Sequence, residues 1–324
     1  MAKVISILMT MAFLVFGGSS QLFGQAYPDR AINLVIPLPV GEGGDVAGRL
    51  VADGLAKVLK VPVVVLNKPG GAVFGAQATD MVVKSKKDGY TIILANASSI
   101  IYTKVLQPDT VPYDSFKDLT PLGLTTMMPM IVTIRSDAPY KDFKEMMDYA
   151  KRNPGKVRFA TPGVGSLGDF DGQIIKALTG TDVASVPFDG ASPGLTALLG
   201  GQVEAVPATP GTVISHLRSG KIKGIVISNK FSEFPDVPTF KQLGYQQDLL
   251  GMWLAFYGPA GLPAQIQETL SSAIEKVVKD PSLSSKLAPM GMTQEFEPPE
   301  KLLMRMQEEY KTAVEIAKRR GMVK

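Results

Sequence analysis

Runs of β-branched and aliphatic residues alternate with helical patterns in the first part of the chain. The strand-like runs cover residues 32–36, 61–66 and 91–95. The helical patterns between them cover residues 46–59 and 76–83. In the first helical pattern Val51 and Leu55 fall on one face, whereas Asp53 and Lys57 fall on the other. Such alternation predicts βαβ units and a largely parallel sheet, so the expected fold class is α/β.

A second set of strands and helices begins near residue 130. Its predicted strands are residues 130–134, 157–160, 183–186, 203–206 and 222–227. Its predicted helices are residues 142–151, 167–178, 193–199 and 212–218. From Pro263 onward the pattern is mostly helical and ends with a helix over residues 299–319. The two sets predict two domains, and we expect the helical tail to pack back on the first.

The N-terminal segment has the features of a secretory signal peptide. Lys3 supplies a positive charge, residues 4–16 form an apolar run, and small residues end the segment at Ala26. We therefore expect residues 1–26 to be removed and the mature protein to begin at Tyr27 in the periplasm. The apolar run is shorter than the ~20 residues of a membrane span. The sequence contains no cysteine, so neither a disulfide nor a lipid anchor on cysteine is expected.

Composition argues against several functional classes. Lys and Arg number 34 against 30 Asp and Glu, an excess too small to predict a nucleic-acid surface. The only histidine is His216, near the end of a predicted helix, and Val164 stands where a nucleophile elbow needs glycine. No cysteine or paired histidine has metal-ligand spacing. We therefore expect no metal and no cofactor, and an enzyme is the less favoured class.

Three loops that lead from a predicted strand into a helix are rich in glycine. They cover residues 37–45, 161–166 and 187–193. Ligands of open α/β sheets bind outside the carboxyl ends of strands, where helix N-termini offer free N–H groups. A dinucleotide fingerprint in the first loop fails because Val46 stands where glycine is required, and Asp45 is expected to cap the helix. Together the loops predict a cleft suited to carboxylate oxygens.

Helix initiation is the alternative explanation for the polar residues of these loops. Ser166 and Asp169 form a capping-box pattern, which by composition alone is the favoured interpretation. In the third loop Ser192 is expected to cap a helix that has Pro193 at its first position.

Several turn motifs stand in one order along nearly the whole expected mature chain. They are Tyr27-Pro28-Asp29-Arg30, Asn67-Lys68-Pro69-Gly70, Asp88-Gly89-Tyr90, Asn153-Pro154-Gly155-Lys156, Leu199-Gly200-Gly201-Gln202-Val203, Pro235-Asp236-Val237-Pro238-Thr239 and Gly258-Pro259-Ala260-Gly261. In this order they resemble the solute receptors of tripartite tricarboxylate transporters, also called the TctC or Bug family.

The resemblance implies a type II periplasmic-binding-protein fold, in which two Rossmann-like domains are joined by crossing strands around a ligand cleft. We place lobe 1 at residues 27–125 plus 232–324 and lobe 2 at residues 126–231. A further crossing is expected at Trp253, whose fluorescence should then respond to lobe closure. The implied function is a monomeric receptor that delivers a small carboxylated solute to membrane transporter subunits. An alternative is a receptor whose loaded form binds a membrane sensor in signalling.

The resemblance carries ligand contacts over to Gly41–Asp45, Gly163–Ser166, Gly190 and Ala191, and to Ser98 and Ser99 after the third strand. With further residues of the loops and of the positions that depart from the family pattern, the expected ligand-binding residues are Leu38, Gly41, Glu42, Gly43, Gly44, Asp45, Ser98, Ser99, Thr161, Gly163, Gly165, Ser166, Asp169, Phe188, Asp189, Gly190, Ala191 and Thr209.

The chain departs from the family pattern at acidic positions. Glu42 stands where glycine is common, Asp169 where histidine is frequent and Asp189 where lysine is frequent, while Ala208 and Thr209 replace an Asp-Asn pair. Each acid near the cleft disfavours an anionic ligand by on the order of 1 kcal/mol. This favours a carboxylate that also carries a positive group, such as an amino acid or a betaine-like compound. The alternative is that these acids face solvent, where the helix dipole favours first-turn acids.

Overall fold

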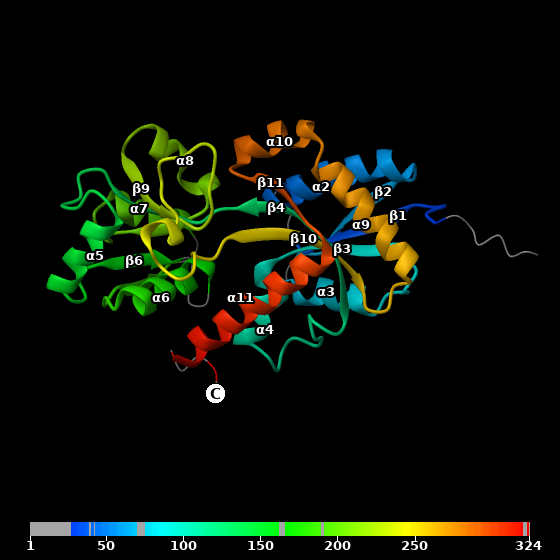
Figure 1. Ribbon diagram of the computed structural model, residues 1–324, viewed down its shortest axis with the longest axis horizontal. Helices are drawn as coiled ribbons and strands as arrows, with labels where there is room; N and C mark the ends of the chain where they lie inside the picture. The colour runs from blue at the N-terminus through cyan, green and yellow to red at the C-terminus, as the bar shows by residue number, and fades with distance from the viewer. Residues whose placement is uncertain are drawn as a thin grey trace, which may run out of the picture.

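The computed structural model describes residues 27–38, 40–41, 43–69, 75–161, 166–188, 191–319 and 323. The expected signal peptide and the site residues Glu42, Gly163, Gly165, Asp189 and Gly190 lie outside these described residues. Two groups of strands and helices lie side by side along the long axis of the molecule (Figure 1). We call the group that contains the first strand lobe 1 and the other group lobe 2. The mixed α/β architecture is as predicted.

Lobe 1 is built on a six-stranded sheet. In spatial order its strands are β2 (Val63–Asn67), β1 (Ile32–Ile36), β3 (Thr91–Asn96), β10 (Met252–Pro259), β4 (Leu119–Met128) and β11 (Thr293–Glu297). β1 pairs in parallel with β2 and β3, as the alternating pattern predicted. β10 pairs antiparallel with β3 and β4, and β11 pairs antiparallel with β4. The sequence pattern had not indicated β4, β10 or β11.

Helices cover both faces of this sheet because successive strand residues point to opposite sides. Ile32 and Leu34 of β1 join a core cluster with α2 (Gly43–Leu59), α9 (Ala264–Val278) and α10 (Pro281–Leu287). Val35 faces the other cluster, which includes α3 (Ala76–Val83), the π-helix η1 (Ser98–Tyr102), α4 (Thr103–Leu106) and α11 (Pro299–Arg319). The predicted packing of the helical tail on the first domain is thereby confirmed.

Lobe 2 has a smaller sheet made of two groups of strands. β8 (Val206–Ala208), β5 (Ile131–Arg135) and β9 (Ile222–Ile227) pair antiparallel. β6 (Arg158–Thr161) pairs in parallel with β7 (Ala184–Pro187), and a bridge from Phe159 to Ala205 joins the two groups. α5 (Phe143–Arg152) and α6 (Leu167–Thr179) share one core cluster. α7 (Ala191–Leu199) and α8 (Pro210–Arg218) share another.

Local capping chemistry explains where some helices begin. Asp142 caps α5 by accepting a 2.8 Å hydrogen bond from the Glu145 N–H. The prediction that Ser192 caps the third-loop helix is wrong, because α7 already begins at Ala191. Ser192 instead lies in the first turn, where its carbonyl accepts a hydrogen bond from the Thr196 hydroxyl. Pro193 is tolerated there because the first N–H groups of a helix have no intrahelical acceptor.

The connections between the lobes lie beside the ends of β4 and β10. β4 ends at Met128 in lobe 1 and β5 begins at Ile131 in lobe 2. The chain returns through residues 229–251 and then enters β10, where Trp253 pairs with Met127. Trp253 therefore lies in the sheet of lobe 1, immediately after the returning segment, and is fully buried. The division of the chain at residues 125 and 231 stays a prediction.

Candidate functional site

The first predicted loop leads from β1 into α2. β1 and β3 are parallel neighbours, so their carboxyl ends lie at the same edge of the lobe 1 sheet. Leu38 is buried against the start of α2, where a Cβ at Gly44 would lie 2.4 Å from Leu38 Cδ1. Gly41 has a φ of 87°, in the left-handed region that glycine adopts without strain. Glycine at these two positions therefore allows the loop to fold closely onto the helix N-terminus, where Gly43 is exposed.

Asp45 holds this loop in place. Its carboxylate accepts hydrogen bonds from the Gly41 N–H at 2.8 Å, Asn67 Nδ2 at 2.8 Å and Arg49 Nε at 3.0 Å. Burial acts to raise the pKa of Asp45, but the bonds from Arg49, Asn67 and Gly41 together lower it below its ordinary value. The prediction that Asp45 precedes and caps α2 is wrong, because Asp45 lies inside the helix and reaches back to the loop. Its carboxylate is already bound within the protein.

Ser98 and Ser99 follow β3 at the beginning of η1. Ser99 is fully buried, and its hydroxyl donates a 3.0 Å hydrogen bond to the Asn96 carbonyl. Ser98 is half-buried at the same edge of the sheet. Of the two serines, Ser98 is therefore the one with a partly accessible side chain.

The second and third loops begin at one edge of the lobe 2 sheet. The parallel register of β6 and β7 pairs Thr161 with Pro187, so the two strand ends are neighbours. Ser166 caps α6 by accepting a 3.3 Å hydrogen bond from the Asp169 N–H, as the capping pattern predicted. Phe188 and Ala191 are half-buried beside the end of β7, and Thr209 precedes α8 without a side-chain cap bond.

Two buried polar side chains stand at the second loop. Thr161 is 1% exposed, and among the described residues its hydroxyl oxygen has no hydrogen-bond partner. A buried hydroxyl without a partner costs about 1–3 kcal/mol, so a group that hydrogen-bonds to Thr161 gains this free energy. Asp169 is also 1% exposed, which argues against the alternative that it faces bulk solvent.

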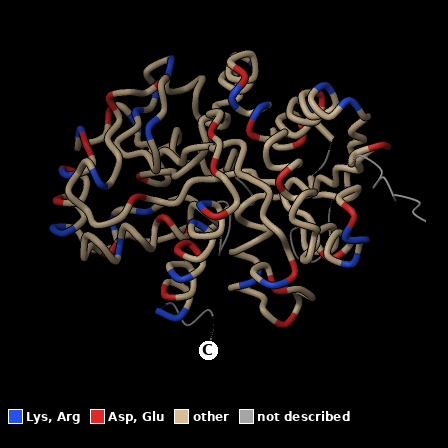
Figure 2. Tube along the Cα trace, turned by 45° about the vertical axis from the view of Figure 1, so that its right-hand side comes forward, with Lys and Arg blue, Asp and Glu red and all other residues tan. Residues whose placement is uncertain are grey.

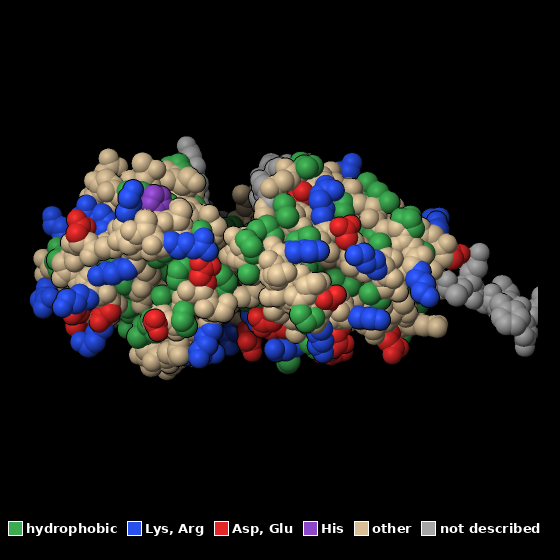
Figure 3. All heavy atoms as spheres, turned by 90° about the horizontal axis from the view of Figure 1, so that it is seen from above, with side chains coloured by type: hydrophobic (Ala, Val, Ile, Leu, Met, Phe, Trp, Pro, Cys, Tyr) green, Lys and Arg blue, Asp and Glu red, His purple; other side chains and the backbone are tan. Residues whose placement is uncertain are grey.

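Contacts between the lobes show that the two strand-end edges face each other. Tyr102 of η1 stacks on Phe170 in the first turns of α6, with ring centroids 5.2 Å apart. Gly291 of lobe 1 lies against Pro210 at the start of α8, where a Cβ at Gly291 would be 2.4 Å from Pro210 Cβ. The space-filling view shows a notch between the lobes (Figure 3). We call this notch the interlobe groove.

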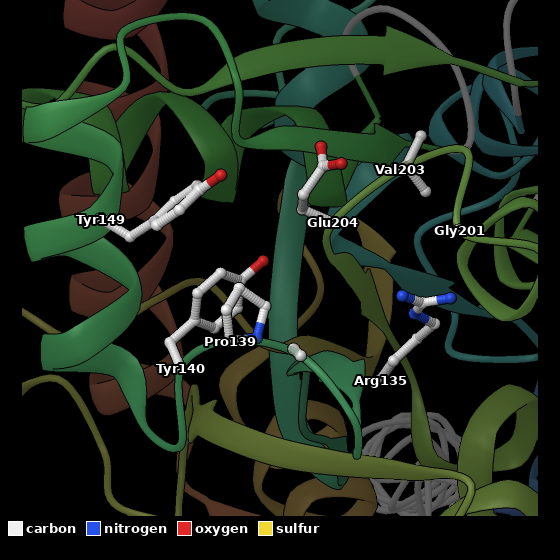
Figure 4. A pocket seen from close by; sticks show the side chains of 8 residues that line it. Arg135, Pro139, Tyr140, Tyr149, Gly201, Val203 and Glu204 are labelled. Atoms are coloured by element: carbon white, nitrogen blue, oxygen red, sulfur yellow. The ribbon is translucent and has the colours of Figure 1, made fainter.

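A separate cavity of about 140 Å³ lies in lobe 2, beside the loop that follows β5 (Figure 4). Tyr140, Tyr149 and Glu204 line it, and burial with the nearby Glu204 charge raises the pKa of Tyr140 to about 12. Arg158 donates two hydrogen bonds of 2.8 and 2.9 Å to the Glu204 carboxylate, which satisfies this acid within the lobe. None of the predicted site residues lines this cavity.

The charged residues and the one histidine of the sequence do not gather into a metal-binding site among the described residues. His216 lies in the last turn of α8, as predicted, and is visible at the surface of lobe 2 (Figure 3). Lys, Arg, Asp and Glu residues are distributed along the chain traces of both lobes (Figure 2). Among the described residues no group of three or more His, Cys, Asp or Glu is placed to hold a metal ion. Within the same part of the chain, no helix has the length and apolar character that crossing a membrane requires.

The comparison with known proteins decides the family. A family model described as the tripartite tricarboxylate transporter family receptor, TctC, matches residues 47–322. The chain belongs to this family. Protein BugT of Bordetella pertussis is 30% identical to it over 280 residues, which cover 86% of this chain and 85% of BugT.

Solved structures of TctC-family receptors agree with the fold. A TctC solute-binding protein from Polaromonas, solved without ligand, is 28% identical with a TM-score of 0.82, covering 90% of this chain and 99% of that one. MatC from Rhodopseudomonas palustris, solved with bound malate, is 28% identical with a TM-score of 0.66 over the same shares of the two chains. The periplasmic-binding-protein fold and the family resemblance are therefore both confirmed, and the chain is a solute-binding receptor of this family.

Sequence reasoning missed the buried cluster of lobe 1 beside α6. Tyr102 and Glu309 meet Trp253 there although the three residues are far apart in the chain. The one available signal was a glutamate at a buried position of the final helix, between Met306 and Ala313. An isolated acid on an apolar helix face indicates a buried partner but does not identify it.

Proposed function

We propose that this TctC-family receptor captures a small carboxylate in the interlobe groove and delivers it to the membrane subunits of a tripartite tricarboxylate-type transporter. The observation that carries the proposal is the buried Thr161 hydroxyl, which has no hydrogen-bond partner in the described part of the chain and stands at the end of β6. Facing strand-end edges with helix N-termini add N–H donors and positive dipole ends, which favour anions. The malate bound by the relative MatC supports a small carboxylate as the ligand class.

Lobe closure is the mechanism by which such a receptor retains its ligand. Moving the lobes together excludes water from the groove, and hydrogen bonds to a carboxylate are stronger in the resulting lower dielectric. The ligand can shift the lobes toward closure only by the difference between its affinities for the closed and open states. The Met128–Ile131 connection and residues 229–251 are the segments that would absorb the movement. No bond in the ligand is made or broken.

We further propose that the ligand carries a positive group beside its carboxylate. Asp169 is buried in the first turn of α6, within the loop region that would receive a carboxylate. A second anion there costs on the order of 1 kcal/mol, whereas a ligand cation gains a similar amount. We therefore expect amino acids and betaine-like compounds to bind more tightly than plain dicarboxylates.

The expected site of action is the periplasm, with the mature protein starting at Tyr27 and working as a monomer. The charged, apolar and small-residue segments of residues 1–26 support export. The absence of cysteine from the whole sequence supports a receptor without a lipid anchor on cysteine.

A thermal-shift screen of residues 27–324 tests the proposed ligand class. The panel contains malate, other di- and tricarboxylates, monocarboxylates, amino acids and betaines. A ligand at 100 times its dissociation constant adds about 2.7 kcal/mol of stability, which raises the melting temperature by several degrees. We expect a shift for a few carboxylates, with zwitterions first. A shift for plain dicarboxylates alone would contradict the positive group, and shifts from non-carboxylates alone would contradict the carboxylate class.

A further inference from the structure

Two buried acids lie where lobe 2 contacts the C-terminal helix. Asp171 of α6 is fully buried, and Glu309 of α11 is 9% exposed. α6 belongs to lobe 2, whereas α11 packs on β4, η1 and α4 of lobe 1 and also contacts α6. We call the contact of α6 with α11, η1 and residues 249–251 the seam. Relative movement of the lobes has to rearrange this seam.

Glu309 is held entirely by groups of lobe 1. Trp253 Nε1 lies 3.0 Å from both carboxylate oxygens, and the Tyr102 hydroxyl donates a 3.2 Å hydrogen bond to one of them. Arg305 Nη1 is 3.7 Å away, but this guanidinium donates its short bonds to Glu297, with Nε at 2.8 Å and Nη2 at 2.5 Å. Arg305, the nearest cation, therefore bonds mainly to Glu297 and not to Glu309.

Asp171 approaches the same place from lobe 2. Its Oδ1 accepts a 2.7 Å hydrogen bond from the Leu250 N–H, in the segment that returns to lobe 1. Its Oδ2 has no hydrogen-bond partner among the described residues. Tyr102 links the two acids, because its hydroxyl binds Glu309 while its ring stacks on Phe170, the residue before Asp171.

This environment disfavours the charged form of both acids. Burial raises the pKa of Glu309 to about 7, although the bonds from Trp253 and Tyr102 and the Arg305 charge oppose the rise. Burial also raises the pKa of Asp171 well above its ordinary value, and the Glu309 charge adds to the effect. The other titratable or charged groups that face Glu309 or line the cavity beside it are Tyr257, Glu297, Lys241, Asp248, Glu295 and Glu308. Among these, acids outnumber cations.

We propose that Glu309 and Asp171 form a proton-binding latch between the lobes. While the pair holds its protons, α6 stays packed against α11; when both acids are charged, the seam loosens and lobe 2 moves more freely. Two like charges without a shared cation are costly in a dry contact, and hydration relieves that cost. A cavity of about 330 Å³, lined by Glu309, Leu250 and Arg305 among others, lies at the seam and gives water a route to the pair. The latch acts without a ligand and does not depend on which solute is bound.

Acrylamide quenching of Trp253 fluorescence in the ligand-free protein measures how far the solvent can reach into the seam. Trp253 is the only tryptophan in the sequence, is fully buried and donates to Glu309. We expect the quenching constant to rise between pH 5.5 and 8.5, with a midpoint near the Glu309 pKa of about 7. Glu309→Gln keeps an acceptor for Trp253 and removes the charge, so its quenching constant should not change with pH. Glu315→Gln, at an exposed position of the same helix that does not line the cavity at the seam, should behave as the wild type.

Asp171→Asn tests the contribution of lobe 2. This variant keeps an acceptor for the Leu250 N–H and removes the negative charge of Asp171. Because that charge no longer disfavours ionisation of Glu309, the midpoint of the Trp253 quenching curve should move to lower pH, and the rise in the quenching constant should be smaller. Small-angle X-ray scattering should show a radius of gyration that differs between pH 5.5 and 8.5 in the wild type but not in Glu309→Gln.

Three outcomes overturn the latch. The first is quenching of the wild type that does not depend on pH, and the second is a dependence that persists in Glu309→Gln. The third is a Trp253 titration with no change in the wild-type radius of gyration, which would leave a proton site that does not control the lobes.

Discussion

At the scale of single residues, side chains with local partners could be predicted and side chains with distant partners could not. The Ser166 cap was predictable because donor and acceptor are three residues apart. The role of Asp45 was predicted wrongly for two reasons. Its partner Asn67 belongs to β2, and its bond from the Gly41 N–H depends on how the loop folds back onto the helix. Thr161 was expected as the first residue of the second glycine-rich loop, but no sequence pattern shows that its hydroxyl is buried without a partner among the described residues.

Thr161→Val should weaken ligand binding without weakening the fold. Valine has nearly the same shape and removes a buried hydroxyl for which the described residues offer no partner, so the melting temperature should stay constant or rise. Loss of a hydrogen bond to a charged group costs about 1.5–3 kcal/mol, so the dissociation constant should rise roughly 10- to 100-fold. Titration calorimetry measures the constant. Thr196→Val on exposed α7 is the matched control, and equal affinities for both variants would rule out the role of Thr161.

Glu309 should make the receptor more stable in mild acid than in mild base. Its pKa is raised from an ordinary 4.5 to about 7, so between these values the folded state binds more protons than the unfolded state. The free energy of unfolding should therefore fall as pH rises from 4.5 to 7, by roughly 3 kcal/mol at most. Urea denaturation at pH 5 and pH 8 measures it. The fall should be much smaller in Glu309→Gln, and an unchanged fall would assign the pH dependence to other groups.

At the scale of elements, amphipathic helices and strands rich in β-branched residues were predictable, whereas the antiparallel strands of lobe 1 were not. α6 was predicted to within one residue because its apolar face repeats at helical spacing and Ser166 marks its start. β10 escaped prediction because it contains no β-branched residue, whereas the equally buried β3 contains Ile92 and Ile93. The pattern of β4 is interrupted by Pro121 and Gly123. The lobe 1 sheet was therefore predicted only at its parallel side.

Ser166→Ala should both destabilise α6 and weaken ligand binding. Loss of a cap hydroxyl costs about 1 kcal/mol of stability, and Ser166 is also one of the expected ligand-binding residues. Asp142→Ala removes the cap of α5 and should lower stability by a similar amount without affecting affinity. Thermal melting with and without ligand separates the two effects. Equal losses of affinity in the two variants would mean that Ser166 acts only through overall stability.

At the scale of the whole molecule, the two-lobed architecture could be predicted from motif order, but the relation between the lobes could not. The seam instead joins Asp171 to Leu250 and Phe170 to Tyr102 across long sequence separations. Composition also carried no information on the facing edges, because glycine-rich loops have the same sequence whether they face each other or solvent. Contacts such as Gly291 with Pro210 supplied that relation.

Titration calorimetry of residues 27–324 against the carboxylate panel tests the proposed function most directly. We expect saturable binding of at least one small carboxylate, with one site per chain, and weaker binding in Thr161→Val than in Thr196→Val. The opposite result is a protein that binds no carboxylate at any accessible concentration while it binds a solute of another class. That result would leave the receptor fold in place and contradict the proposed function of its groove.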